Sequence, residues 1–192
     1  MIRRCAFALA IAAVLVAAAV PSTAGPRLAD VRGHLLLGYA KLFAGDTPGG
    51  SLSVGAGVDH PAGSGLRAGL DLGYHLLGSR TLVQGTLSSG LDYSLFEALA
   101  QLHWAPGGGG PQVVLSGGPG LFVARANLAS SPVGATFSRQ AVEETRAGLA
   151  FGATVARRRA APVRIGLEAG LRVVPLETTT WTLATARLAI LY

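Results

Sequence analysis

The segment Gly65–Leu77, GLRAGLDLGYHLL, decides the fold because its residues change character at every second position. One parity holds only apolar and aromatic residues: Leu66, Ala68, Leu70, Leu72, Tyr74 and Leu76. The other parity holds glycine with charged or ionisable residues: Arg67, Gly69, Asp71, Gly73 and His75. Such alternation is typical of a β-strand with one apolar and one polar face, because successive side chains point to opposite faces. In a helix the same order would spread charge over every face.

The segment Val163–Val174 repeats this pattern clearly, and other parts of the chain follow it to varying degrees. The further segments are Arg32–Phe43, Ser51–Asp59, Ser94–Trp104, Gln112–Arg125, Thr145–Val155 and Ala184–Tyr192. Segments of this length suit a tilted membrane crossing, which needs about 9 to 11 residues per strand. We therefore predict an all-β fold, an eight-stranded antiparallel up-and-down transmembrane β-barrel with a polar, side-chain-filled lumen.

Two of these segments depart from strict alternation. In the first, Lys41 shares the parity of the apolar residues, and near a strand end its long side chain could reach the polar boundary. In Gln112–Arg125, the residues Gly117 to Gly120 include Pro119, which cannot donate a hydrogen bond to a ladder. We expect a β-bulge there, and the strand register beyond it stays open.

The connections between the segments are expected to alternate in length. Residues 60–64, 105–111 and 157–162 are rich in Gly, Pro or charge and predict short turns. Residues 78–92 and 126–142 are longer, which matches the outer loops of membrane barrels. The apolar residues in these two stretches would either extend the strands above the membrane or form a contact surface, and we favour extension.

The N-terminal residues have the composition of a secretory signal peptide. Arg3 and Arg4 precede the apolar stretch Ala6–Val20, and small residues at 22–24 offer a cleavage site. We predict that residues 1–24 are a cleaved signal peptide and that residues 25–192 form one outer-membrane β-barrel domain. The only cysteine, Cys5, would be removed, which leaves the mature domain without disulfides or cysteine-bound metals.

The composition argues against several other classes of protein. Half of the residues are hydrophobic, only 14% are charged and 27 are glycine, which is too apolar for a disordered chain. The surplus of basic residues is scattered, so no nucleic acid is expected as a partner. No His, Asp and Glu grouping has metal-ligand spacing, and the glycines at 107–110 lack the lysine of a phosphate loop, so we predict no metal and no cofactor. The arginines at 157–159 are interpreted as a solvated turn, with contact to an anionic surface as the alternative.

The inward parity of the predicted barrel carries charges of both signs. Eight strands leave an interior just wide enough for side chains, and a buried charge without a partner is costly. We therefore predict a polar network that closes the lumen, with glycines beside the long side chains making room for them. Its proposed members are Arg67, Asp71, His75, Glu97, His103, Glu144, Arg146, Arg164, Glu168, Arg172 and Arg187.

The chain ends on an alternating strand whose apolar face includes Leu188, Ile190 and Tyr192. An aromatic last residue in this setting resembles the closing strand of Gram-negative outer-membrane barrels, which assembly machinery recognises. Together, the signal peptide, the eight segments and the loop lengths resemble the small outer-membrane β-barrel proteins, such as the OmpA transmembrane domain, OmpX and OmpW. That resemblance implies export to the cell outer membrane and a monomer in contact with outer-membrane lipids. It also implies periplasmic chaperones and the barrel assembly machinery as partners.

The resemblance leaves three functions open. The favoured one is a non-enzymatic structural or cell-surface interaction role. A narrow transporter for small apolar molecules is the alternative, because four large apolar residues also have inward parity: Leu36, Leu99, Val114 and Phe122. A lipid A-modifying enzyme is the third, but no histidine is followed by serine two residues later, and we predict no catalytic residues.

Overall fold

The structure is a computed structural model, and its strands close into a β-barrel. It describes residues 31–43, 50–84, 87–106, 112–131, 139–157 and 163–192. The predicted signal peptide, residues 1–24, lies outside the described residues. None of the described residues forms a helix with the length and hydropathy that a membrane crossing requires.

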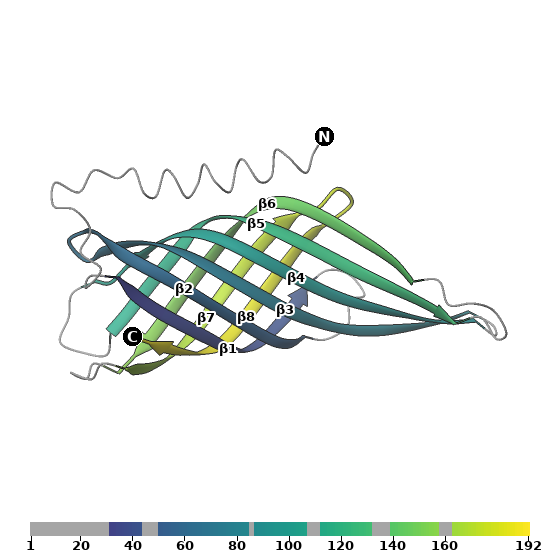
Figure 1. The fold of residues 1–192 in the computed structure, drawn as a ribbon, viewed down its shortest axis with the longest axis horizontal. Coiled ribbons are helices and arrows are strands. Elements are labelled where there is room, and N and C mark those ends of the chain that lie inside the picture. The colour runs from purple at the N-terminus through teal and green to yellow at the C-terminus, as the bar shows by residue number, and fades with distance from the viewer. Residues whose placement is uncertain (1–30, 44–49, 85–86, 107–111, 132–138, 158–162) are drawn as a thin grey trace.

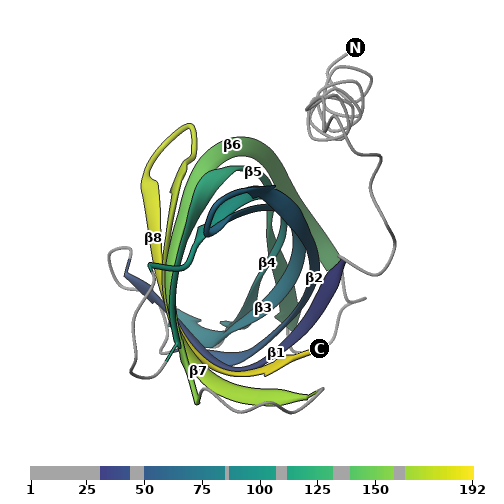
Figure 2. The ribbon, with the colours of Figure 1, turned by 90° about the vertical axis from the view of Figure 1, so that its left-hand side faces the viewer.

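Each strand pairs antiparallel with its neighbour in sequence, and β1 pairs with β8 to close the ring (Figures 1 and 2). The strands are β1 (Arg32–Phe43), β2 (Ser51–Gly63), β3 (Leu66–Gln84), β4 (Leu87–Trp104), β5 (Gln112–Ser131), β6 (Arg139–Ala156), β7 (Arg164–Pro175) and β8 (Thr180–Leu191). All eight segments predicted from alternation are strands, so the predicted fold class is confirmed.

The barrel has two different ends. We call the end where β1 begins and β8 finishes the terminal end, and the opposite end the far end. The connections from β2 to β3, from β4 to β5 and from β6 to β7 lie at the terminal end. The first is a tight turn through Gly65, whose φ of 71° favours glycine.

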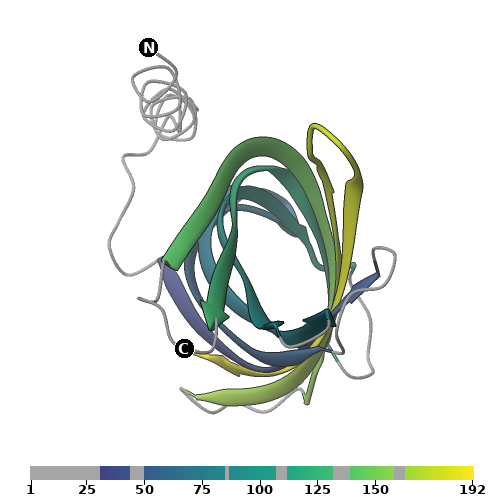
Figure 3. The same ribbon diagram turned by 90° about the vertical axis from the view of Figure 1, so that its right-hand side faces the viewer.

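Four neighbouring strands are longer than the others. β3 to β6 contain 18 to 20 residues each, whereas β1, β7 and β8 contain 12. Residues 79–84, 87–92, 127–131 and 139–141 pair with one another beyond the ring and form what we call the projection, on the right in Figure 1 and facing the viewer in Figure 3. The described residues of the stretches 78–92 and 126–142 are strand, as the favoured extension predicts, while residues 85–86 and 132–138, which include Val133 and Phe137, lie outside the described residues.

The outer surface of the ring is apolar. Many large side chains there are exposed: Leu35, Leu37, Tyr39, Leu52, Val58, Leu72, Phe96, Leu102, Trp104, Phe151, Ile165 and Leu167. Such a belt far exceeds the apolar patches of ordinary soluble monomers and matches the lipid-facing band of a membrane barrel. Lys41 also points outward, and its Nζ lies 5.3 Å from the centre of the Phe43 ring at the far end of β1.

The expected bulge at residues 117–120 is wrong. β5 pairs with β6 without a shift, and the pairs Leu99↔Gly120 and Leu102↔Gly117 keep one register with β4. The glycines explain this continuity, since a side chain at Gly118 would meet the Ala100 carbonyl oxygen of β4. Among the described residues, the register shifts instead between Leu76 and Ser79 in β3 and between Pro61 and Gly63 in β2.

Because of this close approach, substitution by alanine should affect stability differently at two adjacent glycines. We expect Gly118→Ala to lower the free energy of unfolding by about 1 to 3 kcal/mol, because the new methyl group must displace backbone. Gly117→Ala is the matched control, since a methyl group there would lie 3.2 Å from the Phe151 side chain and in ordinary contact, at 3.6 Å, with the Ala150 carbonyl oxygen. Urea unfolding of the barrel in lipid vesicles measures both, and equal stability of the two variants would contradict the strand contact.

Candidate functional site

The lumen is the candidate site, and its side chains form three layers along the barrel. A polar pocket lies at the terminal end, a network of buried charges follows, and an apolar layer lies toward the far end. The layers follow from the tilted strands, because inward residues at the same level come from different positions in each strand.

Two arginines and two glutamates form the buried network. Arg172 donates from Nε and Nη2 to the Glu97 carboxylate at 3.1 and 3.2 Å. Arg187 donates from Nε and Nη2 to Glu168 at 2.8 and 2.7 Å. The pairs also face each other, with 3.8 Å from Arg187 Nη1 to Glu97 and from Arg172 Nη2 to Glu168. All four side chains are buried, so each charge depends on the others for compensation.

Hydroxyl groups and a histidine complete this network. Arg172 Nη1 donates to Thr185 Oγ1 at 3.0 Å, and Ser53 Oγ lies 2.9 Å from His75 Nδ1. His75 Nε2 lies 3.2 Å from Glu97 Oε1. A Ser-His-Glu row is also the outline of a hydrolase triad. Here Ser53 and His75 are 0% exposed and neither lines the polar pocket at the terminal end, so the row packs the lumen and its hydroxyl group is not open to a substrate from that pocket.

Glycines make space for these long side chains. A Cβ at Gly73 would lie 2.6 Å from Glu97 Oε1, and a Cβ at Gly55 would lie 3.2 Å from Arg187 Nη1. A Cβ at Gly170 would lie 2.7 Å from Thr185 Oγ1. The inward glycines of the sequence pattern thus accommodate the charged network.

An apolar layer fills the lumen beyond the network. Its buried members come from seven strands: Ala40, Leu42, Leu77, Leu95, Leu99, Phe122, Ala124, Ala150, Val174, Trp181 and Leu183. Tyr93 packs edge-on against Trp181, with ring centres 6.1 Å apart. The lumen is therefore closed by packed side chains as well as by charge pairs.

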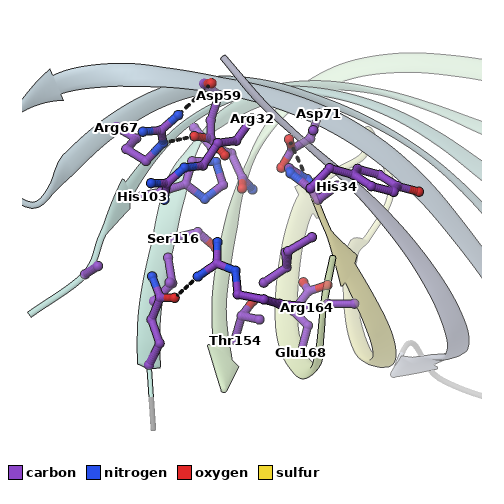
Figure 4. Close-up of a pocket in the computed structure, with 18 of the residues that line it drawn as sticks. Arg32, His34, Asp59, Arg67, Asp71, His103, Ser116, Thr154, Arg164 and Glu168 are labelled. Atoms are coloured by element: carbon purple, nitrogen blue, oxygen red, sulfur yellow. Dashed lines mark hydrogen bonds and ion pairs between the residues drawn. The ribbon is translucent and has the colours of Figure 1, made fainter. Parts of the chain in front are cut away.

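The polar pocket, which we call the vestibule, has a volume of about 280 Å³ and is partly open (Figure 4). Arg67 bonds to Asp59, and Arg164 bonds to the side-chain oxygen of Gln112. Opposite them, His34 Nε2 lies 3.1 Å from Asp71 Oδ1. Other polar lining residues are Arg32, Gln101, His103, Ser116, Thr154 and Glu168.

The residues proposed from sequence fall into three places. The vestibule is lined by Arg67, Asp71, His103, Arg164 and Glu168, while His75, Glu97, Arg172 and Arg187 lie in the network, which Glu168 also joins. Glu144 and Arg146 do not join it. They pair with each other at 2.5 Å at the far end, where Arg146 also bonds to Glu177 and both remain partly exposed. Four further residues of these sites were not predicted from the sequence: Ser53, Thr185, Arg32 and Gln112. Two of them, Ser53 and Thr185, have the inward parity that could have identified them.

The proposed C-terminal signal lies on β8 and just after it. Leu188 and Tyr192 are exposed on the outer face and Ile190 is half-buried. The Tyr192 N–H donates to the Gly33 carbonyl oxygen at 2.9 Å, which fastens the last residue to the start of β1. Its recognition by assembly machinery stays a prediction. Among the described residues, no group of three His, Cys, Asp or Glu side chains is arranged to hold a metal ion.

The network predicts a large difference between two Glu→Gln substitutions. Glu97→Gln should lower the free energy of unfolding by about 3 to 5 kcal/mol, because it leaves buried Arg172 without its charge partner. Glu143→Gln, at an exposed pair with Arg125, should leave stability essentially unchanged. Urea unfolding in lipid vesicles compares them. A Glu97→Gln barrel as stable as the Glu143→Gln barrel would show that the network does not hold the lumen.

The closed lumen also predicts electrical behaviour. The barrel reconstituted in a planar lipid bilayer should show no steady ion conductance, because the apolar layer leaves no continuous water path. Single-channel recording tests this, and a reproducible open level in the purified protein would contradict a closed lumen.

Comparison with known proteins supports the fold alone. No protein-family model and no curated protein matches the sequence. Among solved structures, the chain is similar to neisserial surface protein A (15% identity, 84% of this chain and 96% of that chain, TM-score 0.58). It is similar to Ail, the attachment invasion locus protein of Yersinia pestis, in complex with the heparin analogue sucrose octasulfate (12% identity, 85% of this chain and 99% of that chain, TM-score 0.56). It is also similar to a major outer membrane protein of Thermus thermophilus (12% identity, 84% of this chain and 97% of that chain, TM-score 0.59). The chain therefore has the fold of the small outer-membrane β-barrels that its sequence resembles.

Proposed function

We propose that this protein is a non-enzymatic outer-membrane barrel that contacts other surfaces through its projection. The apolar belt supports insertion in a membrane, and the fold supports the outer membrane as its location. With an even number of strands, β1 begins and β8 finishes at the same end of the barrel. Export by the signal peptide and assembly from the periplasm would leave the projection outside the cell.

The observation that carries this proposal is the pair of free strand edges in the projection. β3 pairs with β2 only as far as His75↔Ser53, and β6 pairs with β7 only from Leu149↔Val173. Among the described residues, the outer edges of β3 beyond Gly78 and of β6 before Gly148 have no partner strand. Such edges pair readily with an extended segment of another polypeptide, so we propose that the projection binds proteins by strand addition.

The other roles have less support. A transporter for apolar molecules would need a path or a lateral opening near residues 117–120, but β5 keeps its register with β4 and β6 there. A lipid A-modifying enzyme would need an exposed nucleophile beside a base, whereas the Ser53–His75 pair is buried. We further propose a monomer in contact with outer-membrane lipids, delivered by periplasmic chaperones and inserted by the barrel assembly machinery.

Shortening the projection tests the proposal. In the variant, residues 79–92 and 127–141 are each replaced by an Asn-Gly turn, which suits a two-residue hairpin. Bacteria displaying the full chain should adhere to cultured epithelial cells or to one another more than vector controls do. The adherence of the shortened variant should fall toward the vector level, because the free edge of β3 beyond Gly78 is lost and that of β6 is reduced to residues 142–147.

Two controls keep the result interpretable. Heat-dependent migration on a gel confirms that the shortened barrel is folded, and surface labelling confirms equal abundance. Glu143→Gln removes an exposed charge at the base of the projection without changing strand pairing, so its adherence should equal that of the wild type. Full adherence by the folded, shortened barrel would refute a role for the projection.

A further inference from the structure

The vestibule contains more arginine side chains than carboxylates that are free to pair with them. Three carboxylates line it, and each already faces a basic side chain. Asp59 bonds to Arg67, Asp71 lies 3.1 Å from His34 Nε2, and Glu168 accepts two hydrogen bonds from Arg187 deeper in the lumen. Each carboxylate of the pocket therefore already has a basic partner.

Two arginines of the vestibule remain without a carboxylate. Among the described residues, Arg164 bonds to the neutral Gln112 side chain, and neither Arg164 nor Arg32 forms an ion pair. Arg32 is close enough to Arg67 and Arg164 to be repelled by both, and only Asp59 attracts it appreciably. Figure 4 shows Arg32 and Arg164 lining the same pocket, from β1 and β7, the two strands that flank β8. Two positive charges thus face a shared space.

Uncharged hydrogen-bonding groups line the same pocket as these arginines. Ser116 and Thr154 contribute hydroxyl groups, and Gln101 contributes an amide. His103 Nε2 is buried without a hydrogen-bond partner among the described residues. An anion in the vestibule would therefore meet donors on several sides, as well as two guanidinium groups.

The size and charge of the space select the class of ligand. A volume of about 280 Å³ lies at the low end for small-molecule sites, which span roughly 300 to 1,000 Å³. A phosphate monoester carries about −1.5 to −2 charges at neutral pH and offers three acceptor oxygens. It therefore matches two unpaired guanidinium groups, whose planar forks suit phosphate oxygens. A single carboxylate would neutralise only one of them.

We propose that the vestibule binds a small phosphate-bearing anion, held by Arg32 and Arg164 with Ser116 and Thr154 as further donors. The phosphate can belong to a soluble molecule that enters from the terminal end or to the headgroup of a neighbouring lipid. The chemistry of recognition is the same in both cases. This site is independent of the projection and of the contacts proposed for it.

Titration of the refolded full-length mature barrel tests the site. Inorganic phosphate is added to the protein in a zwitterionic detergent, with calorimetry for affinity and amide NMR for location. Saturable shifts are expected at vestibule residues such as Gly33, Gln101 and Ser116, and not at Leu95 or Trp181 in the apolar layer. Acetate, with one charge, should bind more weakly. The titration uses the wild-type protein, so its outcome does not depend on whether a variant folds.

Substitutions then assign the arginines. Arg32→Gln and Arg164→Gln should each weaken phosphate binding roughly tenfold or more, as expected for loss of a charge-assisted hydrogen bond. Arg125→Gln is the matched control, because Arg125 is an exposed arginine outside the vestibule, and it should bind phosphate as the wild type does. Heat-dependent gel migration verifies that each variant is folded.

Nanodiscs distinguish the two sources of phosphate. If the ligand is soluble, phosphatidic acid discs should not produce the vestibule shifts by themselves. If it is a lipid headgroup, phosphatidic acid, whose phosphate is a monoester, should produce the vestibule shifts by itself and compete with added phosphate, whereas phosphatidylcholine should not. The proposal is overturned if the wild type shows no saturable binding, if the shifts fall outside the vestibule, or if the Arg32→Gln and Arg164→Gln barrels bind as tightly as the wild type.

Discussion

Charged side chains enclosed by an eight-stranded barrel must find their partners across the lumen, and the rest of this structure depends on that constraint. The ring is too narrow for a broad water channel, so Arg172 and Arg187 are compensated by Glu97 and Glu168. The Arg172–Glu97 contact joins β7 to β4, which do not pair with each other, whereas Arg187 and Glu168 are direct partners on the adjacent strands β8 and β7. The same alternation that brings charges inward leaves the outer face to apolar residues. Burial of charge and exposure of apolar surface are thus two results of one pattern.

The unequal length of the strands divides the molecule into parts with separate roles. The short strands β1, β7 and β8 complete the ring, while β3 to β6 continue past it and leave edges unpaired. The apolar layer separates that end from the vestibule. Contacts proposed for the projection and anion binding proposed for the vestibule therefore do not require passage through the barrel.

The sequence predicts the ring better than it predicts the contacts inside it. Alternation identified all eight strands, and inward parity identified the charged residues, because both depend only on local periodicity. The bulge expected near Pro119 is wrong, since the close approach of Gly118 to Ala100 involves a neighbouring strand that local pattern does not reveal. Parity predicts that a side chain points inward but not its height along the barrel axis, because that height depends on the register between tilted strands. It therefore could not show that Glu144 and Arg146 lie at the far end, away from the network. The apolar layer was missed for the same reason, although the inward parity of Leu99 and Phe122 was visible.

The central claim, that polar residues turn inward and apolar residues turn toward lipid around a closed ring, can be measured directly with adjacent residue pairs. Cys5 is the only cysteine of the chain, so single cysteines in the mature barrel can be labelled without interference. A fluorophore at Leu115 or Val155 should be quenched by brominated lipid, whereas a fluorophore at Ser116 or Thr154, which line the roomy vestibule, should be quenched by aqueous iodide. Equal quenching by lipid within each adjacent pair, or the reverse order, would contradict the account.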